Sequence, residues 1–184
     1  MKKIITSINI TLDGFCDHTA GIADDELHRS VNELFRNIDT LIMGRVTYQL
    51  MENSWPQIAK NPTGNKSFDE FAVLIDKIPK IVFSRTLKKV EWKNTTLAGG
   101  DIKDEVVKLK KQPGKNILAG GPSIIIQLLQ LGLVDECRFY IHPVILGHGL
   151  ALFKNINDRI NLKLLKTEKL GSGVVIVSYE PVKN

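Results

Sequence analysis

The sequence predicts an α/β fold with a mainly parallel central sheet and an antiparallel hairpin at its C-terminal end. Short apolar runs rich in β-branched residues alternate with segments whose apolar residues recur at helical spacing, which is typical of βα units. Two strand-like runs, 162–170 and 174–180, flank a Gly-Ser-Gly turn, which is a hairpin signal. With 184 residues, 43% of them hydrophobic, the chain can bury one sizeable core, so we expect one domain over residues 1–184.

The first strand is predicted over residues 3–10, where β-branched residues dominate. It ends at an Asp-Gly turn, residues 13–14, and α/β sheets place their ligand-contacting loops at such carboxyl ends of strands. A polar loop then leads to a helix over about residues 24–37. Asp24 and Asp25 supply an N-cap and early negative charge to this helix, ahead of one apolar face.

The next strand, residues 40–43, is followed by Gly44 and a helix that runs towards residue 53. Arg45 and Thr47 stand at the start of this helix, where unpaired backbone N–H groups and the helix dipole favour anions. The forked donors of a guanidinium match a phosphate group, and the threonine hydroxyl adds another donor. The sequence equally allows Arg45 to be a solvated surface residue.

A similar pattern follows the third strand. Residues 54–66 contain Pro and Gly turn signals and predict an exposed loop. A buried strand at residues 80–83 then ends at Ser84, Arg85 and Thr86, which again places hydroxyl and guanidinium groups at the carboxyl end of a strand. In nucleotide-binding folds, an arginine near the ribose distinguishes a 2′-phosphate from a bare 2′-hydroxyl.

The most informative stretch is a strand that begins at residue 116 and ends in Gly120 and Gly121. Pro122 and Ser123 then open a helix that runs to about residue 131. Paired glycines let a ligand approach the backbone, proline suits the first helical turn, and the serine hydroxyl can donate to a phosphate oxygen. Taken alone, this pattern also fits a plain strand-to-helix turn. The chain thus has three strand ends that could each bind an anion, which favours one phosphorylated ligand shared by all three.

The remaining segments complete the expected sheet. Strands are predicted at residues 95–97 and 135–145, with a helix at residues 102–111 before the glycine turn. Residues 146–149 are glycine-rich and lead towards the C-terminal hairpin.

Composition restricts the class of partner. The net charge of +5, from 25 basic and 20 acidic residues, is modest, and no interleaving of aromatic and basic residues accompanies it, so we do not expect nucleic acid binding. No apolar run approaches the ~20 residues of a membrane span. Cys16 and Cys137 are isolated and lack metal-site spacing, so we expect no metal centre, no disulfide and a cytoplasmic location.

The order of these motifs resembles that of the dihydrofolate reductase fold, and the resemblance runs from the first strand to the final hairpin. The residues that carry it lie at 41–48, 81–86, 119–121, 134–136 and 143–149. The Thr-Leu-Asp-Gly-Phe segment at residues 11–15 and the short first loop look closer to the reductase domain of bacterial riboflavin biosynthesis and its stand-alone relatives. This resemblance implies a three-layer dihydrofolate reductase-like fold.

The resemblance also implies that NADPH binds across the strand ends, and that a cis peptide bond joins the two glycines of the third junction. The adenosine 2′-phosphate would contact the segment after the third strand. The implied cofactor-binding residues are Gly44, Arg45, Thr47, Ser84, Arg85, Thr86, Gly120, Gly121, Pro122 and Ser123.

The chemistry that the resemblance implies is hydride transfer from NADPH to a C=N or C=O bond of a small pteridine-like, pyrimidine or flavin-precursor substrate. Dihydrofolate reductases carry an acidic residue on the first helix. The counterpart here could be Asp24, Asp25 or Glu26 on the helix, or Asp13 in the first loop, and Asp13 and Asp25 are the candidates for a catalytic carboxylate. Helix capping explains each of the three helix residues better than catalysis does. The spacing places His28 or Asn32 nearer that position, so we do not expect activity on dihydrofolate itself.

The alternative is a non-catalytic, nucleotide-binding or self-associating protein on the same fold. The resemblance implies a homodimer, and apolar residues 174–177 of the final hairpin would be an exposed interface.

Overall fold

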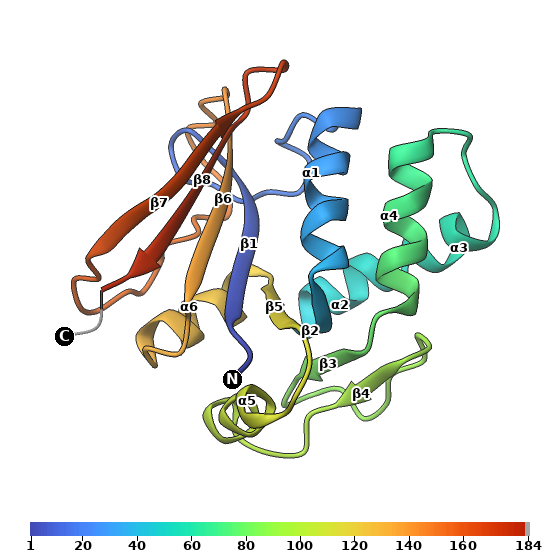
Figure 1. Cartoon of the computed structure of the whole chain (residues 1–184), viewed down its shortest axis with the longest axis vertical. Coiled ribbons are helices and arrows are strands. Elements are labelled where there is room, and N and C mark those ends of the chain that lie inside the picture. The colour runs from blue at the N-terminus through green and yellow to red at the C-terminus, as the bar shows by residue number, and fades with distance from the viewer. Residues whose placement is uncertain (183–184) are drawn as a thin grey trace.

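One eight-stranded sheet runs through the computed structural model, which describes residues 1–182 (Figure 1). The strand order is β4-β3-β2-β5-β1-β6-β8-β7. The strands are β1 (Ile4–Thr11), β2 (Ile38–Gly44), β3 (Lys80–Phe83), β4 (Thr95–Leu97), β5 (Asn116–Gly120), β6 (Glu136–His142), β7 (Leu162–Lys169) and β8 (Val175–Pro181). The helices are α1 (Asp25–Arg36), α2 (Arg45–Glu52), α3 (Trp55–Lys60), α4 (Lys66–Lys77), α5 (Ile102–Lys111) and α6 (Pro122–Gln130).

The sheet is parallel from β4 to β6, and its last two strands form the antiparallel part. β8 pairs antiparallel with both β6 and β7, so the hairpin predicted near the C-terminal end closes this side of the sheet. The predicted fold class is therefore confirmed. Because β1, β2, β3 and β5 are parallel neighbours, their carboxyl ends meet at one edge of the sheet.

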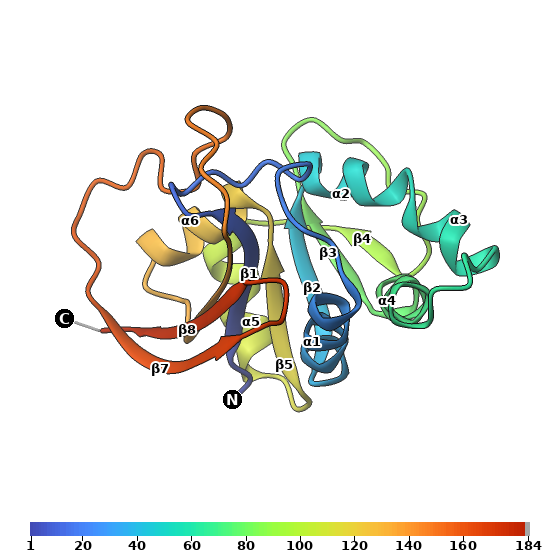
Figure 2. The same ribbon diagram turned by 90° about the horizontal axis from the view of Figure 1, so that it is seen from above.

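Helices cover both faces of the sheet and make three layers (Figure 2). Neighbouring residues of a strand point to opposite faces, so Ile4 packs with α5 and α6 while Ile5 packs with α1 and α4. The first of these apolar clusters contains Ile42, Ile117, Ile125 and Leu128, and the second contains Leu34, Phe35, Leu41, Met43 and Ile75.

One predicted loop contains a helix. Within residues 54–66, α3 forms because Trp55 packs against the rings of Phe68 and Phe71 on α4, with ring centroids 5.0 and 4.6 Å apart. Pro56 fits the first turn of α3, where no backbone donor is needed. The long strand expected over residues 135–145 ends earlier, at His142, because the proline that follows has no N–H to continue the ladder.

The hairpin residues expected at a dimer interface lie in the core instead. Val174 is fully buried, and Ile176 and Val177 are 6% and 7% exposed, because they pack beneath α1 and against the α6 side of the sheet. The placement of the interface at residues 174–177 was therefore wrong. Self-association itself stays a prediction.

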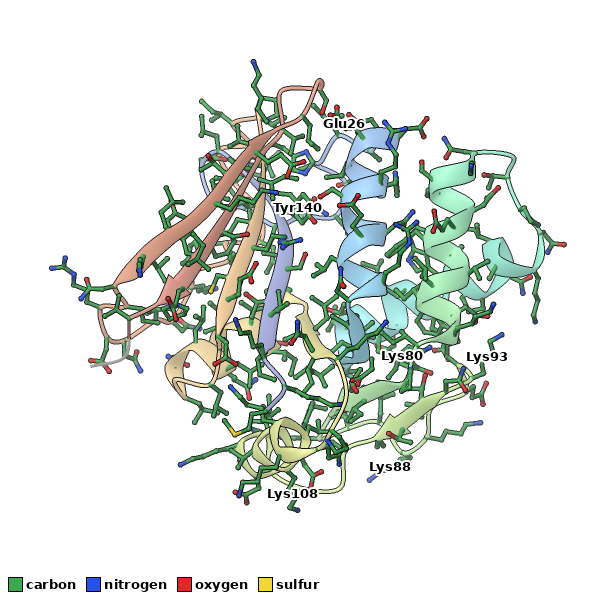
Figure 3. All side chains as sticks on the ribbon, viewed as in Figure 1. Glu26, Lys80, Lys88, Lys93, Lys108 and Tyr140 are labelled. Atoms are coloured by element: carbon green, nitrogen blue, oxygen red, sulfur yellow. The ribbon has the colours of Figure 1, made fainter. Side chains whose placement is uncertain are left out.

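A buried lysine closes the end of α4. Figure 3 labels Lys80 beside the end of α4. Its ammonium donates to the backbone carbonyls of Ile75, Asp76 and Ile78 at 2.9, 3.2 and 2.8 Å, and it lies 4.4 Å from the centre of the Trp92 ring. These carbonyls belong to the last turn of α4 and the residue after it, which lack partners within the helix. Lys80 is the first residue of β3, so its side chain ties the start of this strand to the end of α4.

Among residues 1–182, no helix has both the length and the apolar character needed to cross a membrane.

Candidate functional site

Three of the predicted anion-binding segments meet at the carboxyl edge of the sheet. β2 lies between β3 and β5, with Gly44 opposite Phe83 and Met43 opposite Gly120. The segments that follow these strands, 44–47, 84–86 and 120–123, therefore start side by side. The sequence placed each of them at a strand end, and the parallel pairing brings them together.

The junctions after β2 and β5 interlock through their glycines. A Cβ atom on Gly44 would lie 2.9 Å from the hydroxyl oxygen of Ser123 on α6. A Cβ atom on Gly121 would lie 2.1 Å from the hydroxyl oxygen of Thr47 on α2. Each glycine thus makes room for a hydroxyl of the other junction. The hydroxyls of Thr47 and Ser123 therefore lie at the carboxyl edge of the sheet, beside the starts of α2 and α6.

Both helices at these junctions begin without a side-chain cap. The N-cap residues of α2 and α6 are Gly44 and Gly121, whereas α1, α4 and α5 begin with Asp24, Asn65 and Asp101, whose side chains accept a backbone N–H. The first N–H groups of α2 and α6 are consequently open to an anion, which the positive end of each helix dipole favours.

The cis peptide bond implied for Gly120 and Gly121 is not present, because no residue from 1 to 182 follows a cis bond. The chain turns into α6 through the backbone of Gly121 instead, whose φ of +88° is accessible to glycine at little cost.

The segment after β3 forms a turn that presents an arginine. The Ser84 hydroxyl oxygen accepts the N–H groups of Thr86 and Leu87 at 3.1 and 2.9 Å. Arg85 is exposed and makes no hydrogen bond or ion pair within the described part of the chain. Arg45, by contrast, donates to Gln49 one turn along α2, at 2.9 Å.

Asp13 fastens the loop after β1 to the loop after β6. Its carboxylate accepts the Thr11 hydroxyl at 2.6 Å and the N–H of Gly147 at 2.7 Å, with a further bond from Leu146. The bond from Thr11, followed by that from Gly147, lowers the pKa of Asp13 to about 2. The carboxylate is therefore ionised at neutral pH and cannot donate a proton.

Asp25 lies elsewhere, at the start of α1, where it contacts the start of α4. It accepts the side-chain amide of Asn65 at 2.7 Å and the hydroxyl of Ser67 at 2.8 Å. These two bonds, with that from Asn65 the stronger, hold the pKa of Asp25 below its usual range. The two candidate carboxylates thus bind different segments and do not form a pair.

Sequence reasoning missed the link between His142 and the loop before α1. The ring is 1% exposed, its Nδ1 accepts the N–H of Ile22 at 2.9 Å, and its Nε2 lies 3.0 Å from the side-chain oxygen of Asn9. This places the proton on Nε2, which donates to Asn9. Gly21 packs on the ring, since a Cβ atom there would lie 3.1 Å from it. No local sequence signal joins residues 120 positions apart.

The buried His142 should make stability depend on pH. Burial lowers the pKa of His142 below 6.5 in the folded state. As the pH falls, the unfolded chain therefore binds a proton at this residue more readily than the folded chain does. We expect the free energy of unfolding to fall as the pH drops from 7 to 5, by at most about 1.4 kcal/mol per pH unit. Urea unfolding at several pH values measures this, and the variant His142→Gln should show a shallower slope. An unchanged slope in the variant would rule out His142 as the source.

A family model described as the RibD C-terminal domain matches residues 2–176 of the chain. A curated protein of Bacillus subtilis (strain 168), "Uncharacterized protein YyaP", is 38% identical over 184 residues, which cover 97% of this chain and 94% of that protein. A second protein of the same strain, "Uncharacterized protein YwjB", is 24% identical and matches 94% of this chain and 95% of its own length.

Solved structures share the fold at lower sequence identity. A candidate riboflavin biosynthesis protein of Shewanella sp. PV-4 superposes with a TM-score of 0.73 at 21% identity, over 98% of this chain and 99% of that one. A diaminohydroxyphosphoribosylaminopyrimidine deaminase/5-amino-6-(5-phosphoribosylamino)uracil reductase of Thermotoga maritima gives a TM-score of 0.67 at 18% identity. That match covers 98% of this chain and 57% of the Thermotoga chain.

Proposed function

The chain belongs to the RibD C-terminal domain family, and from this membership we propose that it is an NADPH-dependent reductase of a small heterocyclic substrate. The substrate class that we propose is a pyrimidine, pteridine-like or flavin-precursor ring. The observation that carries the proposal is the interlocked pair of junctions at the carboxyl edge, where two uncapped helix starts and two hydroxyls converge.

The residues present fit a dinucleotide phosphate. The helices α2 and α6 begin at Gly44 and Gly121 without a side-chain cap, so a pyrophosphate would accept from their first free N–H groups. Thr47 and Ser123 offer hydroxyl donors beside it. Arg85, which has no partner in the described part of the chain, would pair with the 2′-phosphate.

When bound, NADPH supplies a hydride for a polarised C=N or C=O bond. The chain's own contribution is position. The helix starts orient the cofactor, while Asp13 holds together the two loops beside β1 on which a substrate ring would rest. We propose that Asp13 and Asp25 act in the reaction as ionised positioning groups, Asp13 between these two loops and Asp25 between the starts of α1 and α4, and that water supplies the proton.

The ionised state of both carboxylates also favours a second candidate, a nucleotide-binding protein without catalysis. The two candidates differ in one measurement. A reductase should oxidise NADPH when pyrimidine, pteridine or flavin-precursor substrates are added, whereas a binding protein should bind NADPH and oxidise none.

The variant Arg85→Ala should separate NADPH from NADH. We expect its affinity for NADPH to fall about tenfold or more, because a charged, forked hydrogen bond to the 2′-phosphate is lost. Its affinity for NADH, which has no such phosphate, should change little. Calorimetric titration of both nucleotides into wild type and variant measures this.

The matched control is Arg159→Ala, which removes an exposed arginine that, among residues 1–182, donates a hydrogen bond to Asn161 alone. Equal losses for NADPH and NADH in Arg85→Ala would reject the 2′-phosphate contact. Absence of binding of either nucleotide to the wild type would reject the reductase proposal.

A further inference from the structure

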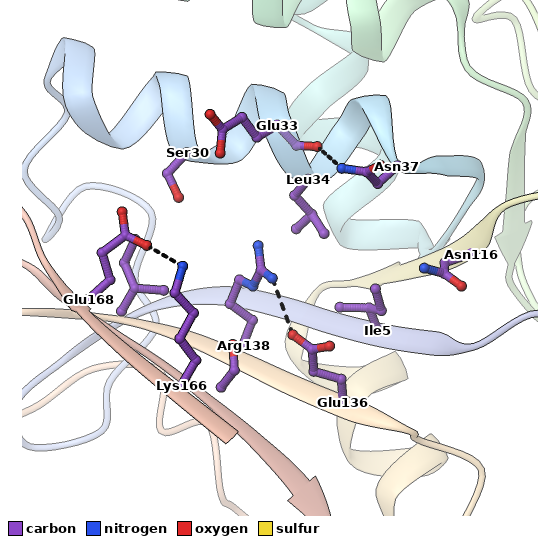
Figure 4. Close-up of a pocket in the computed structure, with 12 residues that line it drawn as sticks. Ile5, Ser30, Glu33, Leu34, Asn37, Asn116, Glu136, Arg138, Lys166 and Glu168 are labelled. Carbon is purple, nitrogen blue, oxygen red and sulfur yellow. Dashed lines mark hydrogen bonds and ion pairs between the residues drawn. The ribbon is translucent and has the colours of Figure 1, made fainter. Parts of the chain in front are cut away.

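A cavity lies away from the carboxyl edge, between α1 and the sheet (Figure 4). Its volume of about 300 Å³ is at the lower end of the range for small-molecule pockets. It shares no residue with the predicted cofactor site. The strand residues that line it include Ile5 and Asn116, which lie at the starts of β1 and β5, so the cavity extends to the amino ends of these parallel strands.

A row of polar residues crosses the sheet on this face. Ser7 of β1 is opposite Arg138 of β6, Arg138 is opposite Ser178 of β8, and Ser178 is opposite Lys166 of β7. Residues opposite one another point to the same face, so all four side chains lie on the side that α1 covers. Figure 4 shows Arg138 directed from β6 into the space beneath α1.

The donors of this row are only partly used. Arg138 donates one hydrogen bond, to Glu136 at 3.2 Å, and its buried Nε has no partner among residues 1–182. Ser178 is 5% exposed, and no hydrogen bond of its hydroxyl to another described residue is present. The Arg138 side chain is 25% exposed and lines the cavity, so an oxyanion there can accept from its terminal N–H groups.

The charges that line the cavity disfavour a simple anion. Two cations, Arg138 and Lys166, face three carboxylates, those of Glu33, Glu136 and Glu168. Lys166 pairs with Glu168 at 2.9 Å and Arg138 pairs with Glu136, so within the described chain the Glu33 carboxylate of α1 is left without an ion pair. The cavity thus presents an unused oxyanion site on the sheet and an unused cation site on the helix, with one net negative charge.

We propose that this cavity binds a small zwitterion of the amino-acid class. Its carboxylate accepts from the terminal N–H groups of Arg138 and from the Ser178 hydroxyl, and its ammonium faces Glu33. The ligand supplies an acceptor on the sheet side and a cation on the helix side, and it keeps the net charge of the cavity unchanged. The proposal does not rest on the proposed reductase function, because the two sites share no residue.

The test is calorimetric titration of the purified protein with the standard amino acids at millimolar concentration. Each ligand that binds is compared with the matched amine, which lacks the carboxylate, and the matched acid, which lacks the amine. We expect one or more amino acids to bind and each half-molecule to bind about tenfold more weakly or worse. Arg138→Met and Glu33→Gln should each lose about tenfold or more in affinity for the zwitterion.

Arg159→Met is the matched control and should bind as the wild type does, since this exposed arginine lies outside the cavity. NADPH titration of Arg138→Met should equal that of the wild type, which separates this proposal from the proposed function. If Arg138→Met does not fold, the exposed Glu33→Gln decides. The proposal is overturned if no amino acid binds the wild type, if the acid alone binds as tightly, or if the folded variants retain full affinity.

Discussion

Replacing Lys80 with methionine is expected to lower the free energy of unfolding by about 3–5 kcal/mol. The methionine keeps most of the apolar length but removes three hydrogen bonds to carbonyls at the end of α4. It also removes a cation near Asp76. This residue is 7% exposed, and its carboxylate forms an ion pair with Lys93 and accepts a hydrogen bond from the Trp92 ring. Burial lowers the pKa of Lys80 to about 8, so at pH 7 the ammonium form still makes these bonds.

Denaturant unfolding of Lys80→Met and of the matched control Lys77→Met measures the effect. Lys77 is exposed at the end of the same helix, so its replacement should change the stability by no more than about 0.5 kcal/mol. A loss below about 1 kcal/mol for Lys80→Met would mean that water replaces the ammonium at these carbonyls.

Replacing Gly121 with alanine is expected to cost about 2–4 kcal/mol of stability and most of the affinity for NADPH. Two causes add. The φ of +88° is unfavourable for alanine, and the new methyl group would lie 2.1 Å from the Thr47 hydroxyl oxygen. Thr47 and the start of α2 must move, which disturbs the two helix starts that we propose to hold the pyrophosphate.

Two further variants separate these causes. Gly132→Ala also has a positive φ, +64°, but its Cβ atom would meet no atom within 4 Å, so it reports the backbone cost alone. The double variant Gly121→Ala with Thr47→Ala removes the closest clashing atom and should recover part of the stability. If Gly121→Ala costs no more than Gly132→Ala, the close approach of the two junctions does not constrain residue 121.

Local pattern was sufficient for most of the strands and helices. Asp24 does cap α1 by accepting the N–H of Leu27, and the Gly-Ser-Gly turn does join β7 to β8. Such signals act between residues close in sequence, so they are visible without the fold. The helix α3 was missed because its stability comes from the packing of Trp55 on α4. The Pro and Gly turn signals of this segment indicate a loop and carry no information on that packing.

Burial and pairing across the sheet were beyond local pattern. The apolar run at 174–177 has the same sequence whether exposed or covered, and only the packing of the layers showed that it is covered. The link from His142 to Ile22 and the row from Ser7 to Lys166 join residues far apart in the chain. The pairing register of the strands decides which of these residues lie next to each other, and that register depends on the whole sheet.

The sequence by itself determined the fold class, the family resemblance and the three strand ends with glycine, hydroxyl and arginine residues, because periodicity and strand-to-helix junctions are local properties of the chain. Only the tertiary structure decided that these ends meet, that Gly121 makes room for Thr47, and that Arg138 and Glu33 face one cavity with unused hydrogen-bonding capacity. The physical reason is that side-chain partners are chosen by packing, which brings distant segments within reach of one another.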